Sequence, residues 1–196
     1  MFVDAYVIED MDHLTRNLHQ PVKHEANPVL KADRPWEGSI DWASVIYDKE
    51  EKLFKAWYLT AGGLAYGTSR DGIHWQKPSL GIREWQGGTA NNLVRPVIVS
   101  PTTIKDPYET NPERKYKMFA LESPPFGMYV AFSPDGTRWR RRDAPVLTSA
   151  NDPQINDRPT MMHDLERRRY IALTKREMIN PYGRGDWGFI HRCRAV

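Results

Sequence analysis

The segment YGTSRDGIHWQKP, residues 66–78, nearly repeats as VAFSPDGTRWRRR at residues 130–142. Both copies contain Ser-x-Asp-Gly-x-x-Trp, and their aspartates are Asp71 and Asp135. Asp-Gly favours a tight turn, because glycine tolerates positive φ and aspartate can hydrogen-bond its own backbone. The flanking runs are rich in aromatic and β-branched residues, so each copy, here called an Asp box, predicts a β-hairpin.

A longer repeat surrounds the Asp boxes. A short apolar run, an Asp, a charged turn, a Lys or Arg and an aromatic-rich strand occur in the same order at residues 43–61, 103–123 and 160–177. The shared aspartates are Asp48, Asp106 and Asp164, at two equal intervals of 58 residues. The chain therefore contains three repeated units, and an Asp box forms the second half of the first two.

Each unit predicts a four-stranded antiparallel meander, which is the architecture of a β-propeller blade. The predicted fold class is all-β. The third unit reaches Val196 where its Asp box is expected, which predicts an incomplete blade and a longer protein. The predicted divisions are residues 1–33 as a leading strand and loop, 34–87 as blade one, 88–150 as blade two, and 151–196 as incomplete blade three. The best candidate helix covers residues 8–18, where apolar residues have helical spacing.

Composition excludes several classes of protein. With 196 residues and 40% hydrophobic residues the chain can form a sizeable core, and it contains no apolar run of membrane-spanning length. The start MFVDAYVIED lacks the pattern of a secretory signal, and the compartment stays open. The sequence contains none of the common metal, phosphate-binding or nucleophile motifs, so we expect no cofactor and no metal.

The net charge of +3 is too small to indicate a polyanionic partner. Two basic runs, at residues 138–143 and 165–170, are expected on outer strands and turns that face water. Neither run is accompanied by an aromatic RNA-binding motif or a helix-turn-helix pattern, so nucleic acid is not an expected partner. The oligomeric state is not predicted.

Several segments resemble bacterial proteins of the five-bladed propeller superfamily that contains invertase-like and arabinanase-like glycoside hydrolases. Such sequences are often grouped with the glycoside hydrolase family 32 N-terminal domain. The segments that carry the resemblance include PWEG, FKAWYLT, NNLV, PERKYKMFALE, FSPDGTRW and RPTMMHDLERRRYIALTK. The resemblance implies that about three of five blades are present, that the substrate is a carbohydrate, and that relatives are exported.

The resemblance also implies an axial funnel lined by residues at the start of each blade's innermost strand. Hydrolysis there needs two carboxyl groups, one to protonate the leaving oxygen and one to act as nucleophile or to activate water. The segments to search are residues 34–42, 88–96 and 151–159. We predict Glu37 and Asp157 as the catalytic pair, with Asp157 kept ionised by Arg158 and Glu37 kept protonated beside Trp36.

The expected substrate-binding residues are Arg158, Asp41, Trp36 and Asn92. Trp42 is a further candidate for stacking on a sugar, while Asp152, Asn91 and Arg95 are polar residues of the same segments. We expect Asp106 to be structural, because the 58-residue interval places it at the far end of its strand, like Asp48.

Two alternatives stay open. The chain lacks Asn-Asp-Pro-Asn-Gly near the first blade and Glu-Cys in the third, which are motifs of the well-studied enzymes. It can therefore be a propeller that binds a carbohydrate or a protein without cleaving it, or a fragment without activity of its own.

Overall fold

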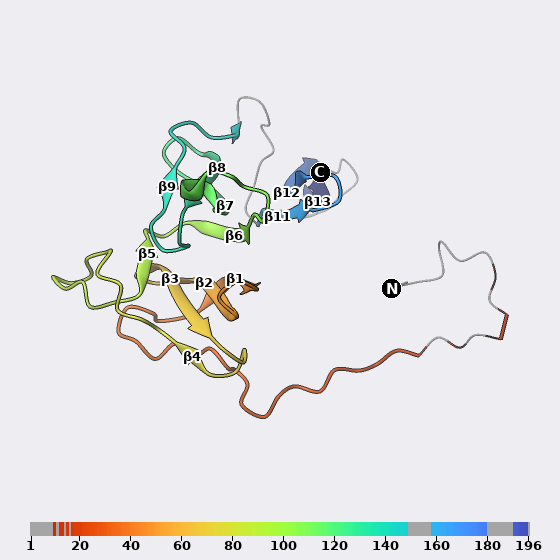
Figure 1. Cartoon of the computed structure of the whole chain (residues 1–196). Helices are drawn as coiled ribbons and strands as arrows, with labels where there is room; N and C mark the ends of the chain where they lie inside the picture. The colour runs from red at the N-terminus through yellow and green to blue at the C-terminus, as the bar shows by residue number, and fades with distance from the viewer. Residues whose placement is uncertain are drawn as a thin grey trace.

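Three antiparallel sheets follow one another along the chain (Figure 1). The computed structural model describes residues 10, 12, 13, 15, 17–148, 158–179 and 190–195. The first sheet contains β1 (Asp41–Asp48), β2 (Leu53–Thr60), β3 (Gly63–Ser69), β4 (Trp75–Gln76) and β5 (Leu93–Arg95). The second contains β6 (Val99–Lys105), β7 (Tyr116–Glu122), β8 (Gly127–Ser133), β9 (Arg140–Arg141) and β10 (Leu147–Thr148), with the short 3-10 helix η1 (Pro112–Arg114) before β7. The third contains β11 (Thr160–Asp164), β12 (Arg169–Ile179) and β13 (Ile190–Ala195).

Within each sheet, the first three strands pair in chain order, as in a meander. The first strands of the sheets, β1, β6 and β11, lie in the middle of the three-sheet arrangement, and the later strands of the first two sheets lie farther out (Figure 1). This arrangement confirms the predicted all-β class and its propeller blades. We call the sheets blades one, two and three.

The outer strand of blades one and two is split into two short pieces. In blade one, β4 and β5 both pair with β3, and residues 77–92 leave the sheet between them. In blade two, β9 and β10 both pair with β8, and the pairing is interrupted between them at residues 143–145. Blade one therefore reaches Arg95, beyond the boundary that the sequence placed after residue 87, because its outer strand resumes after the excursion.

Both Asp boxes form the predicted hairpin with the same contacts. The Ser69 hydroxyl accepts a hydrogen bond from the Gly72 amide, and one Asp71 oxygen accepts from the next two amides. Ser133 and Asp135 repeat this pattern in blade two. The tryptophan of each box donates its ring N–H to the carbonyl of the box glycine. The Asp boxes therefore occupy their polar groups in forming the turn, which explains why the pattern recurs.

Blades one and two share one hydrophobic core. Trp57 of β2 is completely buried. The centroid of its ring lies 5.5 Å from the ring centroid of Tyr66 in its own blade and 6.1 Å from that of Tyr116 in blade two. The Trp57 ring N–H also donates to the Gly136 carbonyl in the second Asp box, at 2.6 Å. The tryptophan thus joins two blades through both packing and a hydrogen bond.

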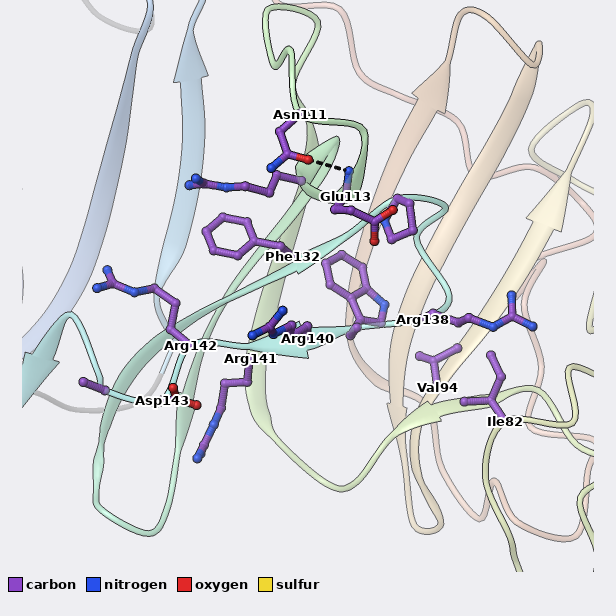
Figure 2. A pocket seen from close by; sticks show the side chains of 14 residues that line it. Ile82, Val94, Asn111, Glu113, Phe132, Arg138, Arg140, Arg141, Arg142 and Asp143 are labelled. Atoms are coloured by element: carbon purple, nitrogen blue, oxygen red, sulfur yellow. Dashed lines mark hydrogen bonds between the residues drawn. The ribbon is translucent and has the colours of Figure 1, made fainter.

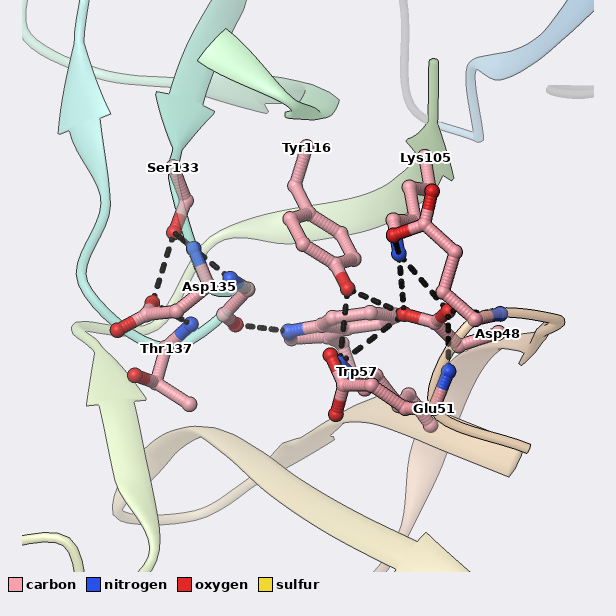
Figure 3. Close-up of polar contacts among 11 residues, drawn as sticks. Asp48, Glu51, Trp57, Lys105, Tyr116, Ser133, Asp135 and Thr137 are labelled. Carbon is pink, nitrogen blue, oxygen red and sulfur yellow. Dashed lines mark hydrogen bonds and ion pairs between the residues drawn. The ribbon is translucent and has the colours of Figure 1, made fainter. Parts of the chain in front are cut away.

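A buried polar network provides a second connection between blades one and two (Figure 3). Asp48, at the end of β1, accepts hydrogen bonds from Lys105 at 2.8 Å and from the Tyr116 hydroxyl, both in blade two. Lys55 of its own blade lies 3.2 Å from the same carboxylate. Burial alone raises the pKa of Asp48, but the bonds from Lys105 and Tyr116 outweigh it and hold the pKa well below its usual value. Asp48 therefore stays ionised between the blades.

The leading segment differs from the prediction. None of the described residues between 10 and 33 lies in a helix or a strand. The predicted helix at residues 8–18 is therefore wrong for its described positions, which are all exposed, so no apolar helical face is buried there. In the described part of the chain, none of the helices is long and apolar enough to cross a membrane.

Candidate functional site

The innermost strands of the three blades begin on the same face. The Thr103 amide of β6 donates to the Ser44 hydroxyl of β1 at 2.9 Å, and the Thr102 hydroxyl of β6 donates to the carbonyl of Pro159, just before β11, at 3.2 Å. At the other end of the strands, Lys105 of β6 contacts Asp48 of β1, and His163 of β11 approaches Asp106 just after β6, so the three strands run side by side in one direction. We call the face at their first residues, Asp41, Val99 and Thr160, the strand-start face.

A strained backbone position recurs at this face. Trp42, Ser100 and Arg158 have φ values of 41°, 48° and 61°, in the left-handed region that residues other than glycine rarely adopt. They are separated by the 58-residue interval. Trp42 and Ser100 lie in register irregularities of β1 and β6. Such bulges and strained residues are common beside functional sites, where they redirect side chains.

The side chains at the recurring position differ from blade to blade. Trp42 is 40% exposed, and Arg158 is also exposed. The Ser100 hydroxyl is buried and has no hydrogen-bond partner among the described residues. Beside Trp42, the exposed Asp41 carboxylate accepts a hydrogen bond from the Ser39 hydroxyl at 2.8 Å. The strand-start face therefore presents an aromatic ring, a carboxylate and a guanidinium, which together can stack on a sugar and bond its hydroxyls.

Glu37 does not reach this face, because its side chain is fully buried in a saturated network. One carboxylate oxygen accepts from the amides of Asp33 and Arg34, at 2.8 and 3.0 Å, and from Lys77 at 2.7 Å. The other accepts from the Tyr58 hydroxyl at 3.0 Å. Burial and the Glu37 charge raise the pKa of Tyr58 far above its usual value, so its hydroxyl remains a donor. Because four groups donate hydrogen bonds to its carboxylate and its side chain is not exposed, Glu37 fixes the loop before β1.

Trp36 and Asn92 belong to the same network. The Trp36 ring N–H donates to the Asn92 side-chain oxygen at 2.8 Å, and the Asn92 amide donates to the Tyr58 hydroxyl at 2.8 Å. Asn92 is buried, whereas Trp36 is half-buried with its ring in edge-to-face contact with Trp85. The polar groups of the Asn92 side chain therefore bind protein atoms. Of the predicted residues, the structure brings Asp41 and Arg158 to the strand-start face. Asp152 and Asp157 lie outside the described residues.

We predict that Glu37→Gln lowers the free energy of unfolding by about 3–5 kcal/mol, because it removes a buried charge and leaves Lys77 without its buried partner. Asp33→Asn is the matched control, since Asp33 contacts the same Lys77 from an exposed position and its loss should change little. Chemical denaturation measures both values. An unchanged stability of Glu37→Gln together with a large loss of activity would restore Glu37 as a catalytic residue.

An ion-pair cluster that sequence reasoning missed lies at the ends of β5 and β7. The Arg95 guanidinium donates to Glu122 at 2.9 Å, and Arg141 approaches the same oxygen at 3.6 Å. Burial lowers the pKa of Arg95, and this effect exceeds the opposite one of the Glu122 carboxylate, which raises the pKa. One Arg95 nitrogen and one Glu122 oxygen are buried without a hydrogen-bond partner in the described residues. The sequence offered no sign of this pair, because Glu122 stands alone at the end of an apolar strand.

Asp106 lies at the far end of β6, as predicted, and it repeats the role of Asp48. It contacts Lys117 of its own blade at 2.9 Å and accepts a hydrogen bond from the Tyr170 hydroxyl of blade three. Burial alone raises the pKa of Asp106, but the bonds from Tyr170 and Lys117 lower it to about 2. Asp106 therefore joins two blades. Within the described residues, no group of three or more His, Cys, Asp or Glu side chains could hold a metal ion.

No family model and no curated protein matches the chain. Among solved structures, the chain is similar to a fructofuranosidase variant from Schwanniomyces occidentalis in complex with fructosylnystose. The identity is 19% and the TM-score 0.53, over 76% of this chain and 31% of that chain. It is also similar to an N-acetylgalactosamine deacetylase from F. plautii in complex with blood group B trisaccharide, at 15% identity and a TM-score of 0.51, over 82% of this chain and 49% of that chain.

Over the aligned part, the chain shares the propeller-like fold of the fructofuranosidase. It spans about a third of the length of the fructofuranosidase, at 31%. Sequence identity below one fifth supports a shared fold, whereas the chemistry of a site depends on its own residues.

Proposed function

We propose that this chain is part of a glycoside hydrolase-like propeller, related to the glycoside hydrolase family 32 N-terminal domain, and that a glycan binds at its strand-start face. The observation that carries the proposal is the parallel alignment of β1, β6 and β11. This alignment brings Trp42 and Arg158, which are distant in the sequence, to the same face. An exposed indole next to a carboxylate suits a sugar, which has an apolar ring face and hydroxyl groups.

In this proposal Asp41 and Asp157 are the two carboxylates of the reaction. Asp157 stands 116 residues after Asp41, which is twice the 58-residue interval, so the two aspartates have the same position in the sequence repeat. One of them protonates the leaving oxygen, and the other acts as nucleophile or activates water. Arg158, directly after Asp157, favours the ionised form of that carboxylate. We assign the role of the first carboxylate to Asp41 instead of Glu37, because the Glu37 carboxylate is buried and hydrogen-bonded to protein groups.

The buried position of Glu37 also favours a second candidate function, a propeller that binds a glycan without cleaving it. Asp41 is then a ligand for sugar hydroxyls, and Trp42 provides the stacking surface. Both candidates use the strand-start face. They differ only in whether a bond in the glycan is broken.

We predict that Asp41→Asn and Asp157→Asn each lower the rate of sugar release by about 10²–10⁴-fold, because each removes a proton donor or acceptor of the reaction. Since Asp41 is exposed, the melting temperature of Asp41→Asn should stay near that of the parent protein. Glu25→Gln, an exposed acid in the leading segment, is the control and should keep full activity. The assay measures reducing-sugar release from a panel of plant and algal polysaccharides, with binding measured in parallel.

The results separate the candidates. Binding that Asp41→Asn or Trp42→Ala weakens, without any sugar release by the parent protein, would support the binding function and exclude hydrolysis. Release that is unchanged in both aspartate variants would remove them from the reaction. A parent protein that neither binds nor cleaves any of these glycans would contradict the proposed function.

A further inference from the structure

Blade two carries a basic groove beside its outer strand β9, and none of the residues that line it belongs to the strand-start face (Figure 2). The groove has a volume of about 1170 Å³ and lies between β9, η1 and the part of blade one that contains Ile82 and Val94. Five arginines line it, namely Arg114, Arg138, Arg140, Arg141 and Arg142. Only two acids, Glu113 and Asp143, accompany them in the lining. We call this region the arginine groove.

Three of the five guanidinium groups have partners. Arg141 stacks on the ring of Tyr129 at 4.2 Å, besides approaching Glu122. Arg114 covers the ring of Phe132 at 4.3 Å. Arg138 forms an ion pair with Asp135 of its Asp box at 3.2 Å, and that pair is largely exposed. These arginines are held by the protein and shape the groove.

Arg140 and Arg142 differ from the other three. Within the described residues, neither of their side chains has an ion pair or a hydrogen bond. The Arg142 amide donates to the Val130 carbonyl, so the chain is still extended beside β8 at this point. Residues two apart in an extended strand project to the same side, about 6–7 Å apart. Arg140 and Arg142 therefore start from the same side of this segment, and both line the groove with charges that no described residue pairs.

The surroundings of these charges favour a glycan over a nucleic acid. Bases bind single-stranded sites by stacking on open aromatic faces. Here Arg114 covers Phe132, while Trp139 packs edge-to-face on Trp57 and donates its N–H to a backbone carbonyl. The carboxylate of Glu113 repels a dense row of phosphates, yet it accepts hydrogen bonds from hydroxyl groups. A ligand with many hydroxyls and widely spaced anionic groups fits this combination.

We propose that the arginine groove binds an anionic glycan, whose sulfate or carboxylate groups are held by Arg140 and Arg142 and whose hydroxyls bond to Glu113 and Asn111. Guanidinium groups bind both kinds of anion through paired N–H donors, which gives short, charge-assisted hydrogen bonds. The Asn111 oxygen already accepts from the Glu113 amide at 3.0 Å, which leaves its amide N–H groups as the donors for a ligand hydroxyl in this proposal. The groove does not depend on catalysis at the strand-start face.

Calorimetry on the whole protein tests this proposal with four probes: a chondroitin sulfate hexasaccharide, an oligogalacturonate, a neutral malto-oligosaccharide, and single-stranded DNA of 12 nucleotides. The double variant Arg140→Ala/Arg142→Ala should bind the preferred anionic oligosaccharide at least about tenfold more weakly, as expected for the loss of two charge-assisted contacts. The control Arg167→Ala/Arg168→Ala changes the net charge equally in the other basic run, and should alter the affinity less than about twofold. Melting curves verify that both variants are folded.

Tighter binding of the sulfated or of the carboxylated probe supports the proposal and identifies the anion. The proposal is overturned if neither anionic probe binds, if the neutral probe binds equally well, or if both double variants lose the same affinity. If the DNA binds more tightly than either anionic glycan, and the Arg140→Ala/Arg142→Ala variant loses this DNA binding, the groove is a nucleic-acid site instead.

Discussion

Replacement of Asp48 by asparagine is expected to lower the free energy of unfolding by about 3–5 kcal/mol, because it breaks a buried ion pair and leaves the buried Lys55 with only the half-exposed Glu51 as a charge partner. The Lys55 side chain is only 3% exposed, and that of Asp48 is fully buried. The variant also weakens the bonds from Lys105 and Tyr116, through which blade two contacts blade one. Urea denaturation followed by tryptophan fluorescence measures the change.

Asp164→Asn is the matched control, because Asp164 has the same position in the repeat. Its carboxylate contacts Arg167 and Arg169, whose side chains are both more than half exposed, so the substitution should leave stability nearly unchanged. If the two substitutions lowered the free energy of unfolding equally, the contacts of Asp48 with blade two would not be the reason that Asp48 stabilises the protein.

Acid should act on the same network. The pKa values of Asp48 and Asp106 in the folded protein lie below the value of about 3.9 for an unfolded aspartate. Their contribution to stability is therefore complete above about pH 4 and is lost as the pH falls toward 2. Asp48→Asn should lose part of this acid sensitivity, and Asp164→Asn should lose less.

Trp57→Ala should lower the free energy of unfolding by about 3–5 kcal/mol, because it empties a large site in the core between blades one and two. It also leaves the Gly136 carbonyl without its 2.6 Å hydrogen bond from Trp57. Trp57→Phe should cost less than Trp57→Ala, since it keeps an aromatic ring and loses mainly the hydrogen bond and part of the volume. Thermal unfolding monitored by circular dichroism compares the variants.

Trp42→Ala serves as the control for Trp57→Ala. Trp42 is 40% exposed at the strand-start face and is expected to affect glycan binding far more than stability. If Trp57→Ala were no more destabilising than Trp42→Ala, the shared core between the blades would not be the main connection between them.

The parts of the fold that depend on local chemistry could be predicted from the sequence. Asp-Gly and its flanking residues specify the hairpin whose contacts Ser69 and Ser133 now show. The 58-residue interval placed Asp48 and Asp106 at matching strand ends. The interruption of the outer strands could not be predicted, because the short pieces β5 and β10 contain too few residues for a strand pattern.

The candidate site could be predicted only in part. An acid beside tryptophan suggested that Glu37 is catalytic. Nothing in the sequence indicates that Lys77, 40 residues later, forms a buried ion pair with the Glu37 carboxylate. The recurring strained position could have been found by subtracting the interval from Arg158, which gives Ser100 and Trp42. Its positive φ depends on bulges that are set by strand pairing, and no local motif records them.

A crystal structure of the protein with a bound oligosaccharide from the glycan panel tests the central claim most directly. The account predicts a sugar ring within about 4 Å of the Trp42 indole, and a sugar oxygen at hydrogen-bond distance, about 3 Å, from the Asp41 carboxylate. It predicts that Glu37 remains bonded to Lys77 and Tyr58, without any contact to the sugar. An oligosaccharide that contacts Glu37, or that leaves both Trp42 and Asp41 untouched, would contradict the assignment of the strand-start face as the glycan site.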